Sequence, residues 1–251
     1  MGLFDKFKKK ESEEAKNGQD VKEAQSTNTD NANAQGADSE NTQGSDVGTS
    51  EIEAAGWEAI EKEFQRVYPG QENPRHYGTL VKWSLGGNDP LDGISIYDGG
   101  DYWHFVSFGL TELYEKETDY PEYSGYGYEL TFKLKKENYE NEEAELKNIC
   151  GIMQAIARMV FNGEVFGDDE FLYTGQTAGI DAFQKSNITG FILIKDPTVQ
   201  SIDTPNGKVD FLEMVGMTDA ELKTLSNVAS VREIYAKLGS DVTNYHRASL
   251  I

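Results

Sequence analysis

The pattern of hydrophobic and polar residues predicts two successive strands near the middle of the chain. An Asp-Gly turn signal at 92–93 stands directly before the β-branched and aromatic run 94–97. The next run, 103–110, predicts a strand with apolar residues on both faces. Trp103 and Phe105 lie on one face, and Val106 and Phe108 lie on the other. A strand without a polar face predicts a sheet that is covered on both sides.

Helical spacing of apolar residues predicts helices near both ends of the globular part and one in its interior. The first helix covers about 57–67. The interior helix follows Asn141, whose side chain can cap it, and stops at Asn-Gly 162–163. Thr-Asp-Ala-Glu at 218–221 is a capping box, and Ser-Val-Arg-Glu at 230–233 repeats that signal before a last helix.

Further strands are predicted around 79–85, 126–135, 190–195 and 208–215. In the second of these, apolar residues alternate with polar ones such as Lys133, which predicts a half-buried strand with one wet face. Strands gather in the middle of the chain, and helices occupy both ends and one interior site. This order predicts an α+β fold with a mixed β-sheet flanked by helices.

The first fifty residues differ in composition from the rest. Residues 1–10 place Leu3, Phe4 and Phe7 among lysines, which predicts a short basic amphipathic element capable of weak peripheral membrane contact. Residues 11–50 lack aromatic side chains and cannot bury enough surface to offset their ordering entropy. We therefore expect a disordered acidic and polar linker, followed by a single domain over residues 51–251.

The formal net charge of −21 is the least ordinary property of the composition. It disfavours binding of nucleic acid or anionic membrane by a general field, and favours basic partners or solubility alone. The single cysteine, Cys150, leaves no intramolecular disulfide or Cys-based zinc site, and its apolar helical setting is typical of a buried, inert thiol. No apolar run approaches the roughly 20 residues of a membrane span, and no secretory signal is evident, so we expect a cytoplasmic protein.

The sequence shows no catalytic constellation. His76, His104 and His246 include no pair at i, i+4 spacing, and neither a P-loop, a dinucleotide fingerprint nor a nucleophile elbow occurs. An aromatic residue on either side of His104 is typical of a hydrogen-bonded structural histidine. We therefore expect no enzyme, no cofactor and no bound metal.

Aromatic and acidic side chains supply the candidate contacts for a partner. The 13 tyrosines combine rigid contact area with a polar group and suit an interface, although some can simply line the sheet. The carboxylate run at 168–170 predicts a solvated acidic loop, with a metal-dependent hydrolase site as the alternative. The candidate partner-binding residues are Tyr97, Tyr114, Tyr123, Asp168, Asp169 and Glu170.

Four separated blocks resemble the suppressor-of-fused family, in the family's order. They are Pro-Leu-Asp-Gly at 90–93, Trp-His-Phe-Val-Ser-Phe-Gly-Leu at 103–110, Ser-Gly-Tyr-Gly-Tyr-Glu-Leu-Thr-Phe at 124–132, and Thr-Pro at 204–205 leading to Phe-Leu at 211–212 and Val-Gly at 215–216. The signature residues are Asp92, Trp103, His104, Phe105, Phe108 and Gly109, which can serve either binding or the fold. The resemblance implies one suppressor-of-fused-like (Sufu-like) domain, a binding fold and not an enzyme.

What the family binds suggests what this chain binds. The animal member is a clamp that holds a short peptide as an added strand between two lobes, and this chain resembles only the amino-terminal lobe. Bacterial single-domain members resemble immunity proteins, or antitoxins, of polymorphic toxin systems. The acidic charge suits a basic toxin domain, for example a nuclease, because opposite charges steer association. The alternative is a regulatory or scaffold module for an endogenous protein.

Overall fold

The computed structural model describes residues 54–173 and 175–251, which lie within one compact unit, Glu53–Ile251. The basic element expected at 1–10 and the linker expected at 11–50 lie outside the described residues. The strands are β1 (Arg75–Gly78), β2 (Gly93–Asp98), β3 (Tyr102–Phe108), β4 (Tyr123–Lys135), β5 (Glu170–Leu172), β6 (Ile188–Lys195), β7 (Ile202–Thr204) and β8 (Gly207–Thr218). The helices are α2 (Ala55–Val67), α3 (Glu142–Phe161), α4 (Asp219–Leu222) and α5 (Val228–Leu238), with a 3₁₀ turn at Trp83–Leu85.

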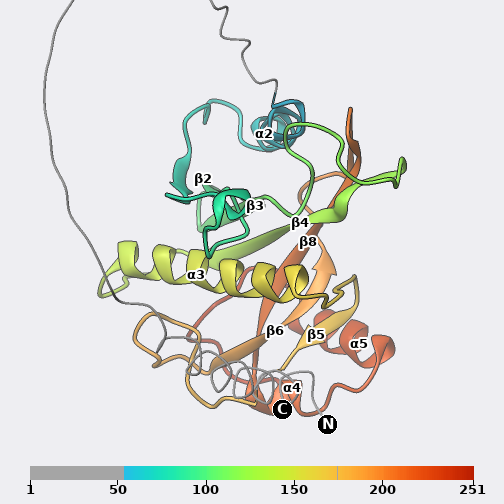
Figure 1. Ribbon diagram of the computed structural model, residues 1–251. Coiled ribbons are helices and arrows are strands. Elements are labelled where there is room, and N and C mark those ends of the chain that lie inside the picture. Colours follow the sequence, from blue (N-terminus) through green and yellow to red (C-terminus); the bar gives the residue numbers. More distant parts are fainter. Residues whose placement is uncertain (1–53, 174) are drawn as a thin grey trace, which may run out of the picture. The chain divides into compact units, whose positions relative to one another are not determined.

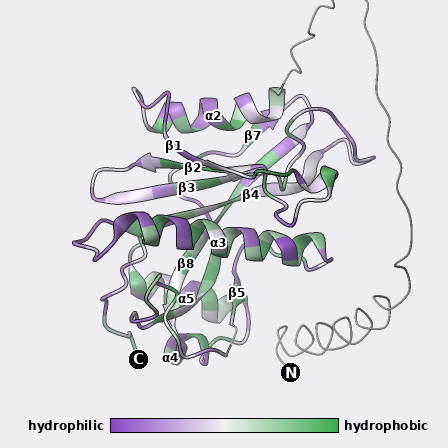
Figure 2. Ribbon diagram, turned by 60° about the vertical axis from the view of Figure 1, so that its left-hand side comes forward, coloured by the Kyte–Doolittle hydropathy of each residue, from purple (hydrophilic) through white to green (hydrophobic). Residues whose placement is uncertain are grey.

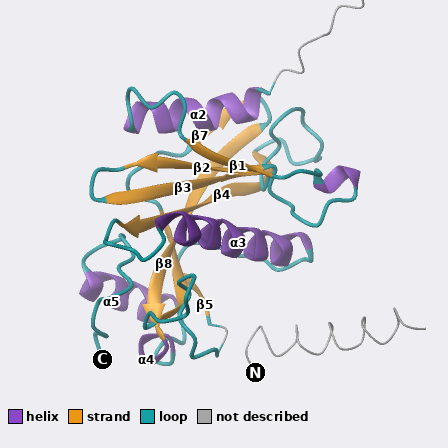
Figure 3. Ribbon diagram, turned by 90° about the vertical axis from the view of Figure 1, so that its left-hand side faces the viewer, coloured by secondary structure: helices purple, strands orange, loops and turns teal. Residues whose placement is uncertain are grey.

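These strands form one mixed sheet in the order β1-β2-β3-β4-β8-β6-β5, with β7 paired to β8 (Figure 1 and Figure 3). The β4–β8 pair is parallel, and the other pairs in the described residues are antiparallel. Helix α2 lies on one face of β1 to β4 and α3 on the other (Figure 3). The predicted α+β fold, a mixed sheet flanked by helices, is confirmed.

The interior helix follows its sequence signals closely. The Asn141 side chain accepts a hydrogen bond from the backbone N–H of Ala144, and three glutamates of the first turn lie near the positive end of the helix dipole. Asn162 ends the helix, and Gly163 follows with φ of 95°, a conformation that favours glycine. Hydrophilic and hydrophobic positions alternate along α3, as expected for a helix with one buried stripe (Figure 2).

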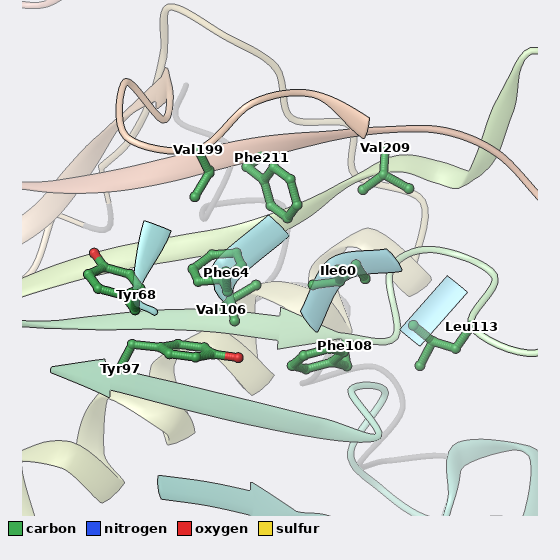
Figure 4. Packing of buried hydrophobic residues seen from close by; sticks show 10 residues of the cluster. All are labelled: Ile60, Phe64, Tyr68, Tyr97, Val106, Phe108, Leu113, Val199, Val209 and Phe211. Carbon is green, nitrogen blue, oxygen red and sulfur yellow. The ribbon is translucent and has the colours of Figure 1, made fainter. Parts of the chain in front are cut away.

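An aromatic cluster joins α2 to the sheet. Phe64 of α2 stacks on Tyr97 of β2, with ring centroids 5.1 Å apart, and meets Phe211 of β8 edge-on (Figure 4). Trp57 stacks on Phe108 of β3 at 4.1 Å. Such contacts stabilise beyond the area that they bury. A second apolar cluster joins α4 and α5 to β6 and β8 through residues such as Ile192, Val215, Leu222 and Val231.

The prediction that β4 has one solvent-exposed face is wrong. Glu129, Thr131 and Lys133 are all buried, with no more than 1% of any of these residues exposed. Alternation of polar and apolar residues predicts exposure only where the polar face has nothing opposite it. Here other charged and hydroxyl side chains from distant parts of the chain face β4 and supply hydrogen bonds.

Two local predictions also differ from the structure. The segment 79–85 is not a strand: β1 lies just before it, and the Lys82 carbonyl accepts bonds from the N–H groups of Leu85 and Gly87, which close a 3₁₀ turn. The last helix begins earlier than residue 230. Asn227 is its cap, and Ser230 is the third helical residue, whose hydroxyl bonds back to the cap. The capping box of Thr218 and Glu221 is confirmed.

Candidate partner-binding surface

Strand β5 forms one end of the sheet and has one open side. It pairs with β6 only, so its other backbone edge has no strand partner among the described residues (Figure 1). Its first residue is Glu170, and the other two candidate carboxylates, Asp168 and Asp169, stand directly before it. Open strand edges are templates for pairing with another chain. The predicted acidic segment therefore lies at an edge that can accept an added strand.

A groove of about 290 Å³ lies beside the start of β5; we call it the β5 groove. Its walls come from the first half of β4, the end of β6 and the middle of β8. Its principal side chains are those of Tyr123, Tyr126, Tyr128, Asp168, Lys195 and Asp210. Tyr123 and Tyr126 are 40% and 48% exposed, which leaves their rings available for contact. The hydroxyl of Tyr128 is buried and has no hydrogen-bond partner within the described residues.

The carboxylates around the β5 groove are held in different ways. Asp168 accepts the backbone N–H of Lys195 at 2.9 Å, and Asp169 forms an ion pair with Arg232 of α5 at 2.5 Å. Glu170 accepts the N–H of Gly167 at 3.2 Å. In the described part of the chain, Asp168 and Glu170 have no cationic partner within ion-pair distance. These two carboxylates are therefore free to pair with a basic ligand.

One cation, Lys195, also lines the groove, and it shares Asp210 with Lys208. Lys195 and Lys208 both lie 3.3 Å from Asp210. Burial by itself would raise the pKa of Asp210. The hydrogen bond from Ser201 and the charges of the two lysines together lower it by more, so the pKa lies below its usual value and the carboxylate stays charged. The Lys208 ammonium also lies 5.8 Å from the centre of the Tyr123 ring. The groove therefore presents aromatic rings between fixed charges of both signs.

The structure brings together some of the predicted contact residues and separates others. Tyr123 and Asp168 line the same groove, and Asp169 and Glu170 follow directly. Tyr114 lies elsewhere and bonds to Lys82 and Asp92.

Tyr97 does not fit the prediction of a surface contact. It is 1% exposed and stacks between Phe64 and Tyr68 in the core, because β2 is covered by α2 on this face. The tyrosine therefore contributes to packing.

Sequence reasoning missed Tyr126, Lys195 and Asp210. The alternation placed Tyr126 on the buried face of its strand, yet Gly125 and Gly127 have φ of 52° and 85° and interrupt the strand geometry. The pairing of β4 with β8 shifts in this stretch, and Tyr126 turns outward. The Gly-Tyr-Gly-Tyr spacing was the available signal, whereas nothing local to Lys195 or Asp210 shows that they meet.

A buried cluster of charged groups lies on the α2 side of the sheet and defines a second candidate for chemistry. The ammonium of Lys133 donates to Asp196, Glu213 and Asp241 at 3.0, 2.9 and 2.6 Å. Asp196 also accepts from His104 Nε2 at 2.9 Å and from the Thr131 hydroxyl at 2.7 Å.

Burial within this cluster sets the protonation states. It lowers the pKa of His104, an effect that Asp196 opposes, and it raises the pKa of Glu213 well above the usual value. His104, Lys133 and Glu213 are each no more than 1% exposed, so these three side chains are not accessible to a substrate. The arrangement supports the prediction of a hydrogen-bonded structural histidine.

Glu129 forms a separate buried site on β4, two residues before the stretch of β4 that pairs with β3. Its carboxylate accepts from the hydroxyls of Ser107 and Thr111 and from the backbone N–H groups of Gly109, Leu110 and Thr111. Burial raises its pKa, and these donors oppose that rise. The carboxylate thereby holds the turn that follows β3.

The described residues contain no group of three or more His, Cys, Asp and Glu side chains placed to hold a metal ion. Cys150 is 8% exposed, and burial raises the pKa of its thiol to about 12. No helix in 54–173 or 175–251 has the length and apolarity needed to cross a membrane.

Comparison with known proteins identifies the fold. The family model described as Suppressor of fused protein (SUFU) matches residues 87–248. The chain belongs to the suppressor-of-fused family. It is 38% identical over 185 residues to "Suppressor of fused homolog" of Homo sapiens and, to the same extent, of Mus musculus, covering 66% of this chain and 36% of each relative. The chain thus spans about a third of the length of the curated relatives that it matches.

Two solved structures of suppressor-of-fused proteins share the fold. A chain of "the Sufu-Fu complex crystal structure" superposes with a TM-score of 0.67 at 32% identity, covering 78% of this chain and 92% of that one. The crystal structure of Drosophila Suppressor of Fused gives a TM-score of 0.66 at 32% identity, covering 78% of this chain and 51% of the other.

The suppressor-of-fused signature residues mostly serve packing in this chain. His104, Phe105 and Phe108 are fully buried in β3. Gly109 has φ of 139°, and a side chain there would meet the backbone of Leu91 at 2.9 Å, so the turn after β3 requires glycine.

The other two signature residues act closer to the surface. The Trp103 ring lies between the cations of Arg75 and Lys136, at 4.5 and 3.9 Å from its centre. Asp92 forms an ion pair with Lys82 at 3.0 Å. In the described structure these residues determine the fold around β2 and β3 and do not line the β5 groove.

Proposed function

We propose that this domain is a protein-binding module without catalytic activity, and that its partner binds at the β5 groove. The observation that carries the proposal is the tyrosine-lined groove at residues 167–168, directly before β5, whose edge opposite β6 is open. A segment of the partner would add a strand to β5, with backbone hydrogen bonds supplying affinity. Basic side chains of that segment would pair with Asp168 and Glu170. A neighbouring part of the partner would occupy the groove and pack against Tyr123 and Tyr126.

The relatives support a binding role of this kind. The solved chain of which this domain covers 92% comes from a complex of Sufu with Fu. The Sufu chain of that complex therefore consists almost entirely of the region that matches this domain. A module that only binds also suits a molecule whose buried His104 and Asp196 have no access to solvent.

For the partner itself, we infer a basic toxin domain of a bacterial polymorphic toxin system, which the protein neutralises as its immunity protein in the cytoplasm. The net charge of −21 supports this choice, because it raises the association rate with a cationic protein. A nuclease toxin, with a basic cleft for nucleic acid, would fit the acidic surface best.

The second candidate is a regulatory or scaffold module for an endogenous protein. The names of the suppressor-of-fused relatives and the complex with Fu favour it. It uses the same β5 groove and differs only in the partner.

Co-purification tests the immunity role. The full chain is expressed with the toxin domain encoded beside its gene, and complex formation is measured from low to high salt. We expect a complex that weakens as salt rises, and growth of toxin-expressing cells that is restored by the chain. No complex at low salt, or no restored growth, would exclude the immunity role and leave the regulatory one.

Charge-neutralising variants test the site. The double variant Asp168→Asn, Glu170→Gln should bind the partner about tenfold more weakly at low salt, mostly through slower association. The matched control, Glu58→Gln with Glu233→Gln, removes the same charge from exposed helix positions. Equal affinities of the two double variants would place the partner elsewhere.

A further inference from the structure

Strand β1 forms the other end of the sheet and also has an open side. The Thr79 N–H donates to the Asp92 carbonyl at 3.1 Å, and β1 and β2 are antiparallel with Tyr77 opposite Ile94. Because hydrogen-bonded pairs alternate in antiparallel strands, the backbone groups of His76 and Gly78 point away from β2. No other strand pairs with β1 in the described part of the chain.

A groove of about 560 Å³ opens beside this edge; we call it the β1 groove. It is bounded by Tyr77 and Gly78 of β1, by residues 79–81 and 86–89, and by the α3 residues Cys150, Gly151 and Gln154. It is larger than the β5 groove at about 290 Å³. A Cβ atom placed at Gly151 would meet no atom within 4 Å, so the α3 wall of the groove has room for a side chain there.

Large apolar side chains of the same segment face solvent. Leu80 and Leu85 are 103% and 76% exposed, and Val81 and Trp83 are 51% and 40% exposed. Isolated exposed apolar residues are ordinary, but four within six positions beside a groove mark an interaction surface. The Trp83 ring packs on Phe161 at 5.4 Å, and Phe161 packs on Tyr126 of the β5 groove at 5.3 Å. A row of aromatic rings thus connects the turn beside the β1 groove to Tyr126 of the β5 groove.

The charges around the β1 groove are matched. Lys82 pairs with Asp92 at 3.0 Å, and Arg158 pairs with Asp89 at 2.6 Å. On the exposed side of α3, Lys147 pairs with Glu143 at 3.2 Å. Asp168 and Glu170 at the β5 groove lack such partners in the described structure. Electrostatic complementarity at the β1 groove therefore favours an uncharged segment, whereas the β5 groove favours a basic one.

We propose that the β1 groove is a second binding site, which takes an extended, uncharged, apolar segment of a partner protein as a strand added to β1. The backbone of that segment would pair with His76 and Gly78, and its side chains would cover Leu80, Val81 and Leu85. This inference rests on the proposed function in taking the partner to be a protein. It adds a second site, at the sheet edge opposite β5, and specifies that an apolar, uncharged segment binds there.

Selection from a random library of displayed peptides of about twelve residues tests the proposal with the full chain as target. We expect enrichment of peptides with alternating apolar residues and no net charge. Their affinity should fall about tenfold in Leu80→Ser, Leu85→Ser, which changes only exposed side chains, and in Gly151→Phe, which fills the groove. Val228→Ser, a change at an exposed position of α5, is the control and should not alter binding.

Hydrogen exchange supplies the second readout. Binding of a selected peptide should slow exchange of the His76 and Gly78 amides about tenfold and leave the β5 amides unchanged. The proposal is overturned if the selected peptides bind the double variant Leu80→Ser, Leu85→Ser and the variant Gly151→Phe as tightly as they bind the unaltered chain. It is also overturned if selection on the unaltered chain enriches no peptide that selection on Gly151→Phe does not. Loss of binding only in Asp168→Asn, Glu170→Gln would assign the peptides to the β5 groove and leave the proposed function standing without this second site.

Discussion

Two charged side chains four positions apart on β4, Glu129 and Lys133, are both buried but are stabilised by different partners. Each lies where a neighbouring strand stops pairing: β3 is last paired at Thr131, and β8 at Phe132. Glu129 accepts hydrogen bonds from backbone groups and hydroxyls of one nearby turn. Lys133 can only donate and carries a buried positive charge, which carboxylates balance, and these come from three separate segments.

The difference shows what a buried charge can organise. A carboxylate can use backbone N–H groups, so Glu129 orders a loop without any opposite charge. An ammonium surrounded by carboxylates ties together the segments that bear them, and a lost partner leaves unbalanced charge in the interior. We therefore expect removal of Lys133 to be the more damaging change.

The largest expected effect comes from Lys133→Met, which leaves Asp196, Glu213 and Asp241 facing one another without a cation. Breaking a buried ionic cluster in this way should lower the free energy of unfolding by about 3–5 kcal/mol. Urea denaturation measures it, with Lys135→Met on the same strand as control, because no ion pair involves Lys135 within the described residues. A loss no larger than in the control would mean that the cluster contributes nothing to stability.

The next effect is that of Glu129→Gln. The amide presents donors to a site that already contains the N–H groups of Gly109 and Thr111, so at least one donor loses its acceptor. We expect a loss of about 2 kcal/mol in the free energy of unfolding, measured against the exposed change Glu115→Gln. If Glu129→Gln costs more than Lys133→Met, the proposed ranking of the two sites is wrong.

The change Glu213→Gln should have a smaller effect on stability, and the size of that effect depends on pH. Burial, reinforced by Asp196, raises its pKa well above 4.5 although Lys133 opposes the shift. A group whose pKa is raised on folding contributes stability at low pH and loses it as pH rises above the unfolded value. Glu213→Gln stays neutral, so it should gain about 1 kcal/mol relative to the unaltered protein between pH 5 and pH 8. Denaturation at both pH values tests this, and equal destabilisation at the two would show that the carboxyl is ionised throughout.

The smallest effect is expected for Asp241→Asn. In the described structure Asp241 accepts no hydrogen bond from a backbone N–H group, and its side chain is 21% exposed, so water can replace part of the lost attraction to Lys133. The free energy of unfolding should fall by about 0.5–1 kcal/mol. Thermal denaturation in parallel with Asp203→Asn provides the comparison. A loss near that of Lys133→Met would instead make Asp241 the essential partner.

Local features were predictable from the sequence because their causes lie within a few residues. The cap at Asn141, the stop at Gly163 and the capping box of Thr218 each depend on neighbours three or four positions away. The apolar faces of β3 were equally clear, and they placed helices on both sides of the sheet. The predicted start of the last helix was Ser230 and not Asn227, because both residues are of a type that caps helices and they stand three positions apart.

Features that depend on distant partners were not predictable. Lys133 looks solvated in its own strand, and the residues that bury it are 63, 80 and 108 positions away. The same limit applies to the β5 groove: Asp168 and Tyr123 were candidates on chemistry alone, but their meeting with Lys195 and Asp210 depends on strand order. Tyr97 failed as a surface contact because nothing in β2 reveals that α2 covers it.

The separation between Lys133 and Asp241 matters while the protein is being made. At about 5–20 residues per second, a ribosome adds the 108 residues between them in roughly 5–20 seconds. Throughout that interval β4 exists without Thr243, which later bonds to the backbone of Lys133 and Lys135. The nascent chain therefore has to keep an unfinished strand in water until its last segment has emerged, and a chaperone that shields β4 would act in that window.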